Sequence, residues 1–353
     1  PSASAASAAS ADAPTSSDTS SWVASYSSDF LWRWPQLHLE SGLVNMTSGG
    51  ADETMTRTFD LGAGEAVEVS LPAQGEGVRG VLLADPCTDS TYRACTYGSD
   101  FHTKERTPAL LEALVGDSRN GVSFWGILGD NFYDKSGNIT TQFFDSLSDD
   151  VTNKVMLTVP GNHDYWVDGS PAEAMDDDQY GNGFAQFYAM DPYAATKGEG
   201  DEYLNLTVDP GAVGSDDSER LAAMDNFQWY NQVGNAAFIG YSGAYSYSEQ
   251  ESFFEEACAW LGDNEDTADV AMLVGHWNVP DSGCGVDADV ATTHALLGDI
   301  DGCSGFKAKG RLLWFSGHTH CASVSLIGDQ GFLVAGQGQS GCGQYAFPVI
   351  DTT

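Results

Sequence analysis

Basic residues are scarce in this chain. Its 353 residues include 14 Lys and Arg against 51 Asp and Glu, so the formal net charge is −37. A protein that binds nucleic acid through the phosphate backbone needs a basic patch, because such binding is driven by the release of counterions. The shortage of basic residues therefore excludes nucleic acid as a partner. It also argues against fast electrostatic capture of anionic substrates.

Long apolar runs and two familiar metal-binding patterns are also missing. No stretch of 18 apolar residues occurs, so the sequence predicts no membrane span within this chain. The cysteines lack the Cys-x-x-Cys spacing of structural zinc sites, and no acidic cluster matches the frame of an EF-hand calcium loop. The chain begins without Met and without a signal-like apolar segment, which fits a processed mature protein.

Three Asn-x-Thr sequons and seven cysteines favour an oxidising compartment. We expect glycosylation at Asn45, Asn138 and Asn205, and a secreted or extracellular chain with disulfide bonds. Proximity along the chain is the only guide to the pairing of the cysteines. It favours the pairs Cys87 with Cys95, Cys284 with Cys303, and Cys321 with Cys342. Cys258 is then left without a partner.

Composition divides the chain into three parts. Residues 1–21 are almost wholly Ser, Ala, Thr, Asp and Pro, and they cannot bury enough apolar surface to offset chain entropy. We expect a flexible tail there, or alternatively a tail ordered by packing on a neighbouring molecule in an extracellular assembly. Residues 22–77 predict a β-rich N-terminal extension, because apolar and polar residues alternate at 54–59 and 66–71. Residues 78–353 form the main domain.

Four glycine-led motifs carry the chemistry, and each follows a short apolar run. The runs, at residues 123–128, 155–159, 270–274 and 312–315, are rich in β-branched or aromatic residues, as buried strands are. We therefore expect the polar residues that follow them to cluster at one edge of the sheets. The motifs are Gly129-Asp130-Asn131-Phe132-Tyr133, Gly161-Asn162-His163-Asp164, Gly275-His276 and Gly317-His318-Thr319-His320.

Oxygen and imidazole ligands that converge from separate strands predict a two-metal hydrolase. Glycine before each ligand supplies a tight turn where backbone bulk must be small. A carboxylate that bridges two ions holds them a few ångströms apart, so that a water bound to them ionises and attacks phosphorus in line. The ions also stabilise the negative charge that builds on the transferred oxygens.

The order and wording of these motifs resemble the calcineurin-like metallophosphoesterases. Tyr133 narrows the likeness to the purple, or tartrate-resistant, acid phosphatases, and the resemblance covers residues 78–350. The first motif of that family, an Asp at the end of the first strand, falls on Asp85. The resemblance implies an α/β fold, a four-layer α/β/β/α sandwich with the metals at the sheet edge. It also implies hydrolysis of phosphate monoesters.

The resemblance further implies two metal ions held by seven side chains. The first ion would be ferric iron, because phenolate and carboxylate oxygens suit a trivalent iron, and the second would be iron, zinc or manganese. Asp85, Tyr133 and His320 would bind the first ion, Asp130 would bridge the two, and Asn162, His276 and His318 would bind the second.

Other residues are candidates for proton transfer and for orienting ligands. The resemblance implies that His163 contacts the substrate phosphate or assists the leaving group, and Asp164 is a plausible partner for an imidazole. The family supplies another histidine about nine residues beyond the Gly-His motif, which this chain lacks. His294 would substitute if its loop folds back, and Asp281 is a weaker candidate general acid.

Cys87 is the clearest departure from the family pattern. It stands two residues beyond Asp85, where purple acid phosphatases have Gly and most other members of the superfamily have a His ligand. We expect Cys87 to be oxidised in a disulfide rather than to act as a thiolate ligand.

Three hypotheses about function follow from this sequence. The first is a secreted phosphatase with two metal ions that acts on phosphate monoesters, either small molecules or phosphoproteins. The second is a phosphatase-like domain with little turnover that serves as an extracellular structural or adhesion component. The third keeps the metals and changes the substrate to a phosphodiester or a nucleotide anhydride.

Overall fold

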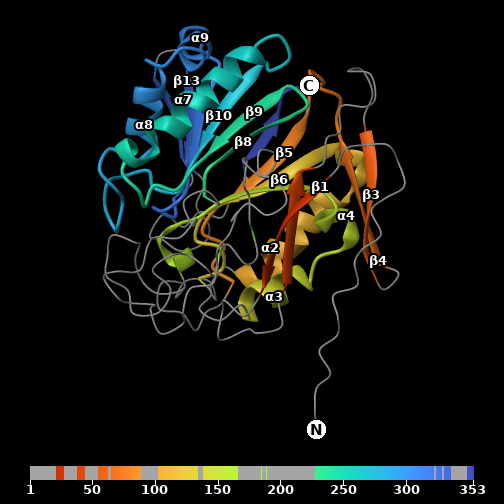
Figure 1. The fold of residues 1–353 in the computed structure, drawn as a ribbon. Coiled ribbons are helices and arrows are strands. Elements are labelled where there is room, and N and C mark those ends of the chain that lie inside the picture. The colour runs from red at the N-terminus through yellow and green to blue at the C-terminus, as the bar shows by residue number, and fades with distance from the viewer. Residues whose placement is uncertain are drawn as a thin grey trace.

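Strands alternate with helices along most of the chain (Figure 1). The computed structural model describes residues 21–27, 38–43, 55–62, 65–88, 102–133, 138–165, 184, 188, 227–321, 323–327, 330–334 and 348–353. The predicted tail at residues 1–21 lies outside this part of the chain except for Ser21, with which the first strand begins.

Residues 79–159 and the C-terminal strand β14 build a sheet of four strands with short helices. The strand order is β14-β5-β6-β7, in which β5, β6 and β7 are parallel and β14 is antiparallel to β5. The strands are β5 (Arg79–Leu83), β6 (Val122–Leu128), β7 (Val155–Val159) and β14 (Val349–Asp351). The helical segments are α2 (Thr103–Leu111), η3 (Glu112–Gly116), η4 (Ser118–Asn120), α3 (Asn138–Phe144), α4 (Asp149–Thr152) and η5 (Asn162–Tyr165).

A second sheet has six strands, in the order β12-β13-β11-β10-β9-β8. Strands β9, β10, β11 and β13 are parallel, and the two edge strands are antiparallel to their neighbours. The strands are β8 (Trp229–Val233), β9 (Ala236–Gly240), β10 (Val270–Val274), β11 (Leu312–Ser316), β12 (Ser323–Ile327) and β13 (Gln330–Val334). The helices are α7 (Tyr247–Asp263), α8 (Val290–Leu297) and α9 (Cys303–Ala308).

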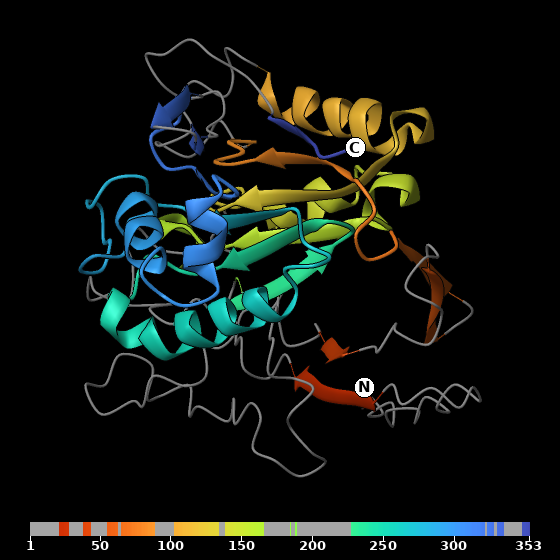
Figure 2. The same ribbon diagram turned by 90° about the horizontal axis from the view of Figure 1, so that it is seen from above.

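The two sheets pack face to face, and helices cover their outer faces (Figure 2). Phe124 of β6 meets Phe238 of β9 in the layer between the sheets, with ring centroids 5.1 Å apart. Trp229 of β8 crosses the same layer and donates from Nε1 to the carbonyl oxygen of Thr158 in β7 at 2.8 Å. A Cβ on Gly240 would lie 2.2 Å from the Trp229 ring, so only glycine leaves room for it. The four-layer α/β/β/α sandwich is therefore confirmed.

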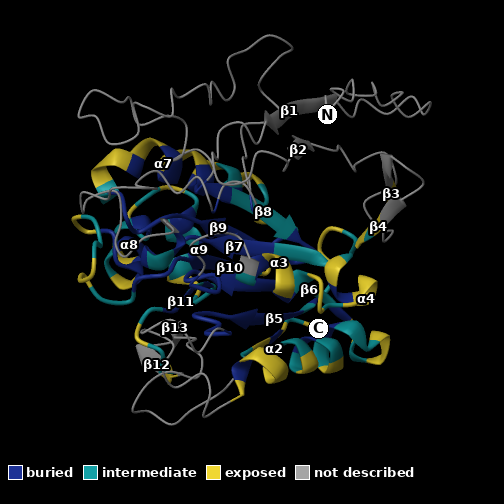
Figure 3. Cartoon of the chain, turned by 90° about the horizontal axis from the view of Figure 1, so that it is seen from below, coloured by how far each residue is buried: buried dark blue, intermediate teal, exposed yellow. Residues whose placement is uncertain are grey.

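The central strands β5, β6, β9 and β10 are buried along nearly their whole length, whereas the helices are exposed on their outer sides (Figure 3). The apolar runs read from the sequence are strands β6, β7, β10 and β11, as predicted. Helix α7 begins with a capping box, in which Ser246 and Glu249 satisfy each other's backbone amides. None of the described helices is long and apolar enough to cross a membrane.

Two hairpins precede the main domain. Strand β1 (Ser21–Ser27) pairs with β2 (His38–Leu43), and β3 (Met55–Gly62) pairs with β4 (Glu65–Leu71), both antiparallel. The strands expected from alternation at residues 54–59 and 66–71 are therefore present. The division into an extension at 22–77 and a main domain at 78–353 stays a prediction.

One predicted disulfide pairing is wrong. Cys258 in α7 is bonded to Cys303 at the start of α9, so Cys303 is not paired with Cys284, and Cys258 is not left over. Cys284 is a free thiol. Proximity in the sequence failed because α7 and α9 pack side by side on the six-stranded sheet although 45 residues separate the two cysteines. Cys87 and Cys321 are disulfide-bonded, and their expected partners Cys95 and Cys342 lie outside the described residues.

The Cys258–Cys303 bridge should contribute measurably to stability. Replacing both cysteines by Ala should lower the free energy of unfolding by about 4 kcal/mol, because the bridge closes a loop of about 45 residues in the unfolded chain. Denaturant unfolding without reductant measures the loss. Cys284→Ala is the control, since it removes a thiol that bridges nothing. Peptide mapping that links Cys303 to Cys284 would contradict the assignment.

Candidate metal centre

The predicted ligands stand at the carboxyl ends of parallel strands in both sheets. Asp85 follows β5, Asp130 follows β6 and Asn162 follows β7, all in the four-stranded sheet. His276 follows β10 and the His318 motif follows β11, in the facing sheet. Because the carboxyl ends of parallel strands meet at one edge, residues far apart in sequence converge there.

The turns that present these ligands are strained. Nine non-glycine residues of the described chain have positive φ, and six of them belong to the motifs. A left-handed backbone costs an ordinary residue about 1–2 kcal/mol, and such strain gathers at functional sites where the surroundings impose it. The six residues are Asp85, Asp130, Phe132, Tyr133, His318 and His320.

The glycines that lead the motifs serve mainly to let groups approach. Gly129 has a φ of +84°, as expected for a tight turn, and a Cβ there would lie 2.5 Å from the His276 ring. Gly161 and Gly317 are needed for space instead, because a Cβ would lie 2.3 Å from Oδ1 of Asp130 and 2.6 Å from Oδ2 of Asp85. The sequence predicted that each glycine is needed for a tight turn. The structure shows instead that Gly161 and Gly317 are needed because a side chain there would collide with a carboxylate.

Asp85, Tyr133 and His320 form one group of candidate ligands. Oδ1 of the fully buried Asp85 lies 3.1 Å from Nε2 of His320 and accepts from the Tyr133 hydroxyl at 3.4 Å. The Tyr133 hydroxyl lies 2.8 Å from the same His320 nitrogen. The other Asp85 oxygen, Oδ2, accepts from the backbone N–H of His318 at 3.0 Å, which ties β5 to the turn after β11. The structure therefore brings together the three residues predicted to share a metal.

His276 and His318 form a second group. Nδ1 of His276 donates to the carbonyl oxygen of Leu128 at 2.8 Å, so its Nε2 faces the cluster. That Nε2 lies 3.2 Å from Nδ1 of His318. Two nitrogens at about 2.0–2.1 Å from one zinc ion in tetrahedral geometry are about 3.3 Å apart, so this spacing suits a shared ion.

Asp130 lies between the two groups. Its Oδ1 is 3.4 Å from Nε2 of His276 and accepts from the backbone N–H of His163 at 2.9 Å. Asp85, Asp130 and His276 offer ligand atoms that all lie within 4.8 Å of one another, and all three residues are buried. Asp130 therefore lies close to one member of each group, Asp85 and His276.

Asp164 braces two of the turns. It accepts from the backbone N–H and the side-chain amide of Asn131, at 2.8 and 3.0 Å, and from the backbone N–H of Gly161 at 2.7 Å. The expectation that Asp164 orients an imidazole is corrected: the groups that it accepts from are amides of the turns after β6 and β7. The sequence offered Asn131 inside a motif but gave no sign of this role.

Burial and charge shift several pKa values at the site. Burial lowers the pKa of His276, but Asp130 and Asp85 outweigh it and raise that pKa to about 9. Burial and then the same two carboxylates raise the pKa of the Tyr133 phenol well above its usual value. Burial and then Asp130 raise the pKa of Asp164 to about 7. Burial lowers the pKa of His163, which favours a neutral ring near pH 7.

The donor set of the cluster fits metal ions. Oδ1 of Asn162 is buried and has no hydrogen-bond partner in the described structure, which is costly unless a cation binds it. Carboxylate, phenol, amide and imidazole together suit iron, zinc or manganese. Cys87 is oxidised, as predicted, so its sulfur is not a thiolate ligand.

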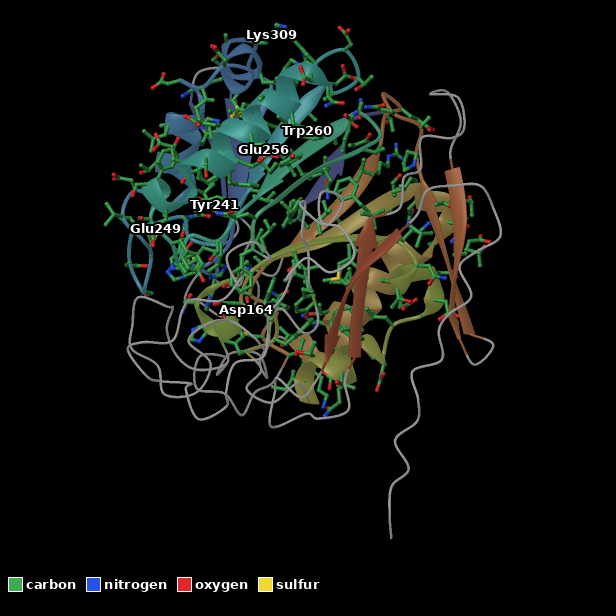
Figure 4. The ribbon with its side chains drawn as sticks, in the orientation of Figure 1. Asp164, Tyr241, Glu249, Glu256, Trp260 and Lys309 are labelled. Carbon is green, nitrogen blue, oxygen red and sulfur yellow. A yellow bond between two sulfur atoms is a disulfide. The ribbon has the colours of Figure 1, made fainter. Side chains whose placement is uncertain are left out.

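His294 does not belong to this cluster, which corrects its predicted catalytic role. It is buried on α8, and its Nε2 lies 3.0 Å from the carbonyl oxygen of Leu312, the first residue of β11. The ligands follow the last residue of that strand, about 13 Å further along. Figure 4 shows Lys309, just before β11, at the top of the view and well away from Asp164. Helix α8 packs along the strand and cannot fold back.

The family model described as calcineurin-like phosphoesterase matches residues 99–322. No curated protein matches the chain.

Similar solved structures include three of low identity. GAP50, described as the anchor in the inner membrane complex of Plasmodium, is 19% identical, with 76% of this chain and 75% of that one covered and a TM-score of 0.38. The purple acid phosphatase PPD1 of yellow lupin seeds is 13% identical, with 80% and 48% covered and a TM-score of 0.41. PhoD is 14% identical, with 86% and 65% covered and a TM-score of 0.42. The match thus spans about half of the lupin enzyme. Identities and TM-scores this low support no conclusion about function.

Metal binding should release protons. With a pKa of about 9, His276 carries a proton on both ring nitrogens at pH 7 in the metal-free protein, and an ion that binds Nε2 has to displace one. The apparent affinity for Zn²⁺ should therefore rise by up to about tenfold per pH unit and level off above pH 9. Calorimetry at pH 7 in two buffers of different ionisation enthalpy should show at least one proton released per chain. Binding without proton release would contradict this arrangement.

Proposed function

The chain belongs to the calcineurin-like phosphoesterase family, and we propose that it is a secreted acid phosphatase that hydrolyses phosphate monoesters with two metal ions. The observation that carries the proposal is the convergence of Asp85, Asp130 and His276 at one buried edge, beside an Asn162 oxygen that has no hydrogen-bond partner in the described chain. Four strand ends contribute to this arrangement, and two buried carboxylates with oxygens within 4.8 Å of each other favour the binding of a cation.

Each group of side chains would hold one ion. Asp85, Tyr133 and His320 would bind the first, Asn162, His276 and His318 the second, and Asp130 would bind both. Ionisation of the Tyr133 phenol is opposed by burial and by two carboxylates, so a trivalent ion such as Fe(III) suits the first position. Iron, zinc or manganese suits the second. When bound, such ions supply an activated water and neutralise charge on the transferred phosphoryl group.

His163 is the residue proposed to act on the substrate. Its backbone N–H fixes the bridging carboxylate, and its ring lies beside the Tyr133 ring with centroids 4.7 Å apart. Burial lowers its pKa, so the neutral ring can donate one hydrogen bond to a phosphoryl oxygen. In acid the ring gains a second proton, which makes it a better proton donor to the leaving alkoxide.

Export is also a proposal, supported by the chain's cysteine chemistry. The Cys258–Cys303 bridge and the oxidised Cys87 and Cys321 fit an oxidising compartment. Glycosylation is proposed for the three sequons. Asn45 and Asn205 lie outside the described residues, and Asn138 is described by its backbone alone, at the start of α3.

The second candidate is a domain with little turnover that serves an extracellular assembly, in which the N-terminal tail contacts neighbours. One observation favours it: no histidine is in place to protonate the leaving group from the loop after β10. The position nine residues beyond His276 is Gly285, and a Cβ there would lie 2.5 Å from the backbone of Tyr245. His294, the substitute, is at the far end of β11.

Two substitutions separate metal binding from turnover. Asp130→Asn should remove both ions and all hydrolysis of 4-nitrophenyl phosphate, because one carboxylate serves both positions. His163→Ala should keep two ions per chain and slow turnover by about 100-fold or more. Metal content by mass spectrometry and initial rates measure the two effects. Full metal content in Asp130→Asn would contradict the bridge, and faster hydrolysis of bis(4-nitrophenyl) phosphate than of the monoester would favour a diesterase.

The visible spectrum tests the first ion. A phenolate bound to ferric iron absorbs visible light, so the natively purified protein should be coloured and Tyr133→Phe should lose the band. A colourless protein that still holds two ions would rule out iron but not hydrolysis. A colourless protein without metal and without turnover would favour the structural candidate.

A further inference from the structure

The loop after β10 turns back over one of the proposed ligands. Oδ1 of Asp281 lies 2.7 Å from Nε2 of His318, although 37 residues separate them. The other ring nitrogen of His318, Nδ1, faces Nε2 of His276 at 3.2 Å. The His318 ring is therefore held between a carboxylate on one side and the proposed position of the second metal on the other.

The backbone around Asp281 is well fixed. Its N–H donates to the carbonyl oxygen of Val279 at 2.9 Å, and its own carbonyl oxygen accepts from the N–H of Cys284 at 3.0 Å. The buried Trp277 anchors the same loop by donating from Nε1 to the carbonyl oxygen of Ser282 at 3.3 Å. The Trp277 ring also lies near the His318 ring, with centroids 6.1 Å apart. The loop thus holds the Asp281 carboxylate against the His318 ring.

The two proposed histidine ligands of the second metal are oriented by different groups. His276 is completely buried and is oriented by the backbone carbonyl oxygen of Leu128, which the end of strand β6 holds in place. His318 is oriented by a carboxylate whose side chain is 61% exposed. An acceptor on one ring nitrogen fixes the proton there and leaves the other nitrogen as the ligand.

We propose that Asp281 is a positioning residue for the second metal. By accepting from Nε2–H of His318, it selects the tautomer whose Nδ1 lone pair points at the cluster. This inference rests on the proposed function, because His318 has to be a metal ligand for Asp281 to position it. It replaces the expectation that Asp281 acts as a general acid, since its carboxylate already accepts from a ligand.

The consequence is an asymmetry between the two metal positions. The ligand Asp85 of the first position is fully buried, although the side chain of its partner His320 is 17% exposed. The second position depends on a hydrogen bond at the surface, in a loop that begins just beyond the ligand His276. We expect the second metal to be the more easily exchanged one, and loss of Asp281 to affect that metal alone.

Zinc titration of the full-length, metal-stripped protein tests this role. Asp281→Ala should weaken one of two Zn²⁺ binding events by about 10–100-fold and leave the other unchanged, as for other partners of ligating histidines. Asp281→Asn should retain most of the affinity, because its amide oxygen accepts the same hydrogen bond. Asp301→Ala removes an equal charge from another exposed position and should change neither event. The ¹⁵N shifts of the His318 ring in the metal-free protein should show the Nε2–H tautomer, and Asp281→Ala should lose that preference.

The outcomes separate this proposal from the proposed function. Two unchanged Zn²⁺ events in Asp281→Ala would overturn the positioning role and leave the two-metal phosphatase intact. Equal weakening in Asp281→Asn and Asp281→Ala would assign the effect to charge and likewise overturn the hydrogen bond. Absence of Zn²⁺ binding by the unaltered protein would overturn both proposals. The thermal midpoint of each variant shows whether the fold is kept, and the exposed side chain of Asp281 predicts that it is.

Discussion

The burial of two carboxylates side by side is the constraint on which this site depends. Asp85 and Asp130 are both buried, and both carboxylates lie close to Nε2 of His276. Two like charges in a dry interior repel each other and lose their hydration, so they need a positive partner. A protonated imidazole supplies part of that positive charge, and the raised pKa of His276 shows that the carboxylates favour its protonated form. The same demand makes the cluster a receptor for cations.

The sandwich supplies the rigidity that such a cluster needs. Its candidate ligands stand on strained turns, which persist only where the surroundings hold them. The surroundings here are two sheets joined through a dense apolar layer and through polar ties such as Trp229 to Thr158. Asp164 then fastens the turn after β6 to the turn after β7. The site is therefore built on strand ends, which the sandwich holds in place.

The group of Asp85, Tyr133 and His320 and the group of His276 and His318 differ in the solvent exposure of the residues around them. Asp85 and Tyr133 lie within the protein, whereas the His318 ring reaches toward a loop whose carboxylate is largely exposed. Under the proposed function, turnover would rest on His163, because Gly285 stands nine residues beyond His276, where the resemblance implies a histidine for the leaving group.

The sequence alone determined the strands, the candidate ligand motifs and the family resemblance. Each motif is a short apolar run followed by glycine and a polar residue, and these residues are consecutive in the chain. The four-layer sandwich and the grouping of Asp85, Asp130, Tyr133, His276, His318 and His320 were implied by the family resemblance, and the structure brings these six residues together. Tertiary structure decided what depends on packing between distant segments. It paired Cys258 with Cys303, sent His294 to the far end of β11, turned Asp164 onto Asn131, and set Asp281 against His318. Spacing along the chain carries no information on such contacts, since helix packing and loop direction set them only once the sheets have formed.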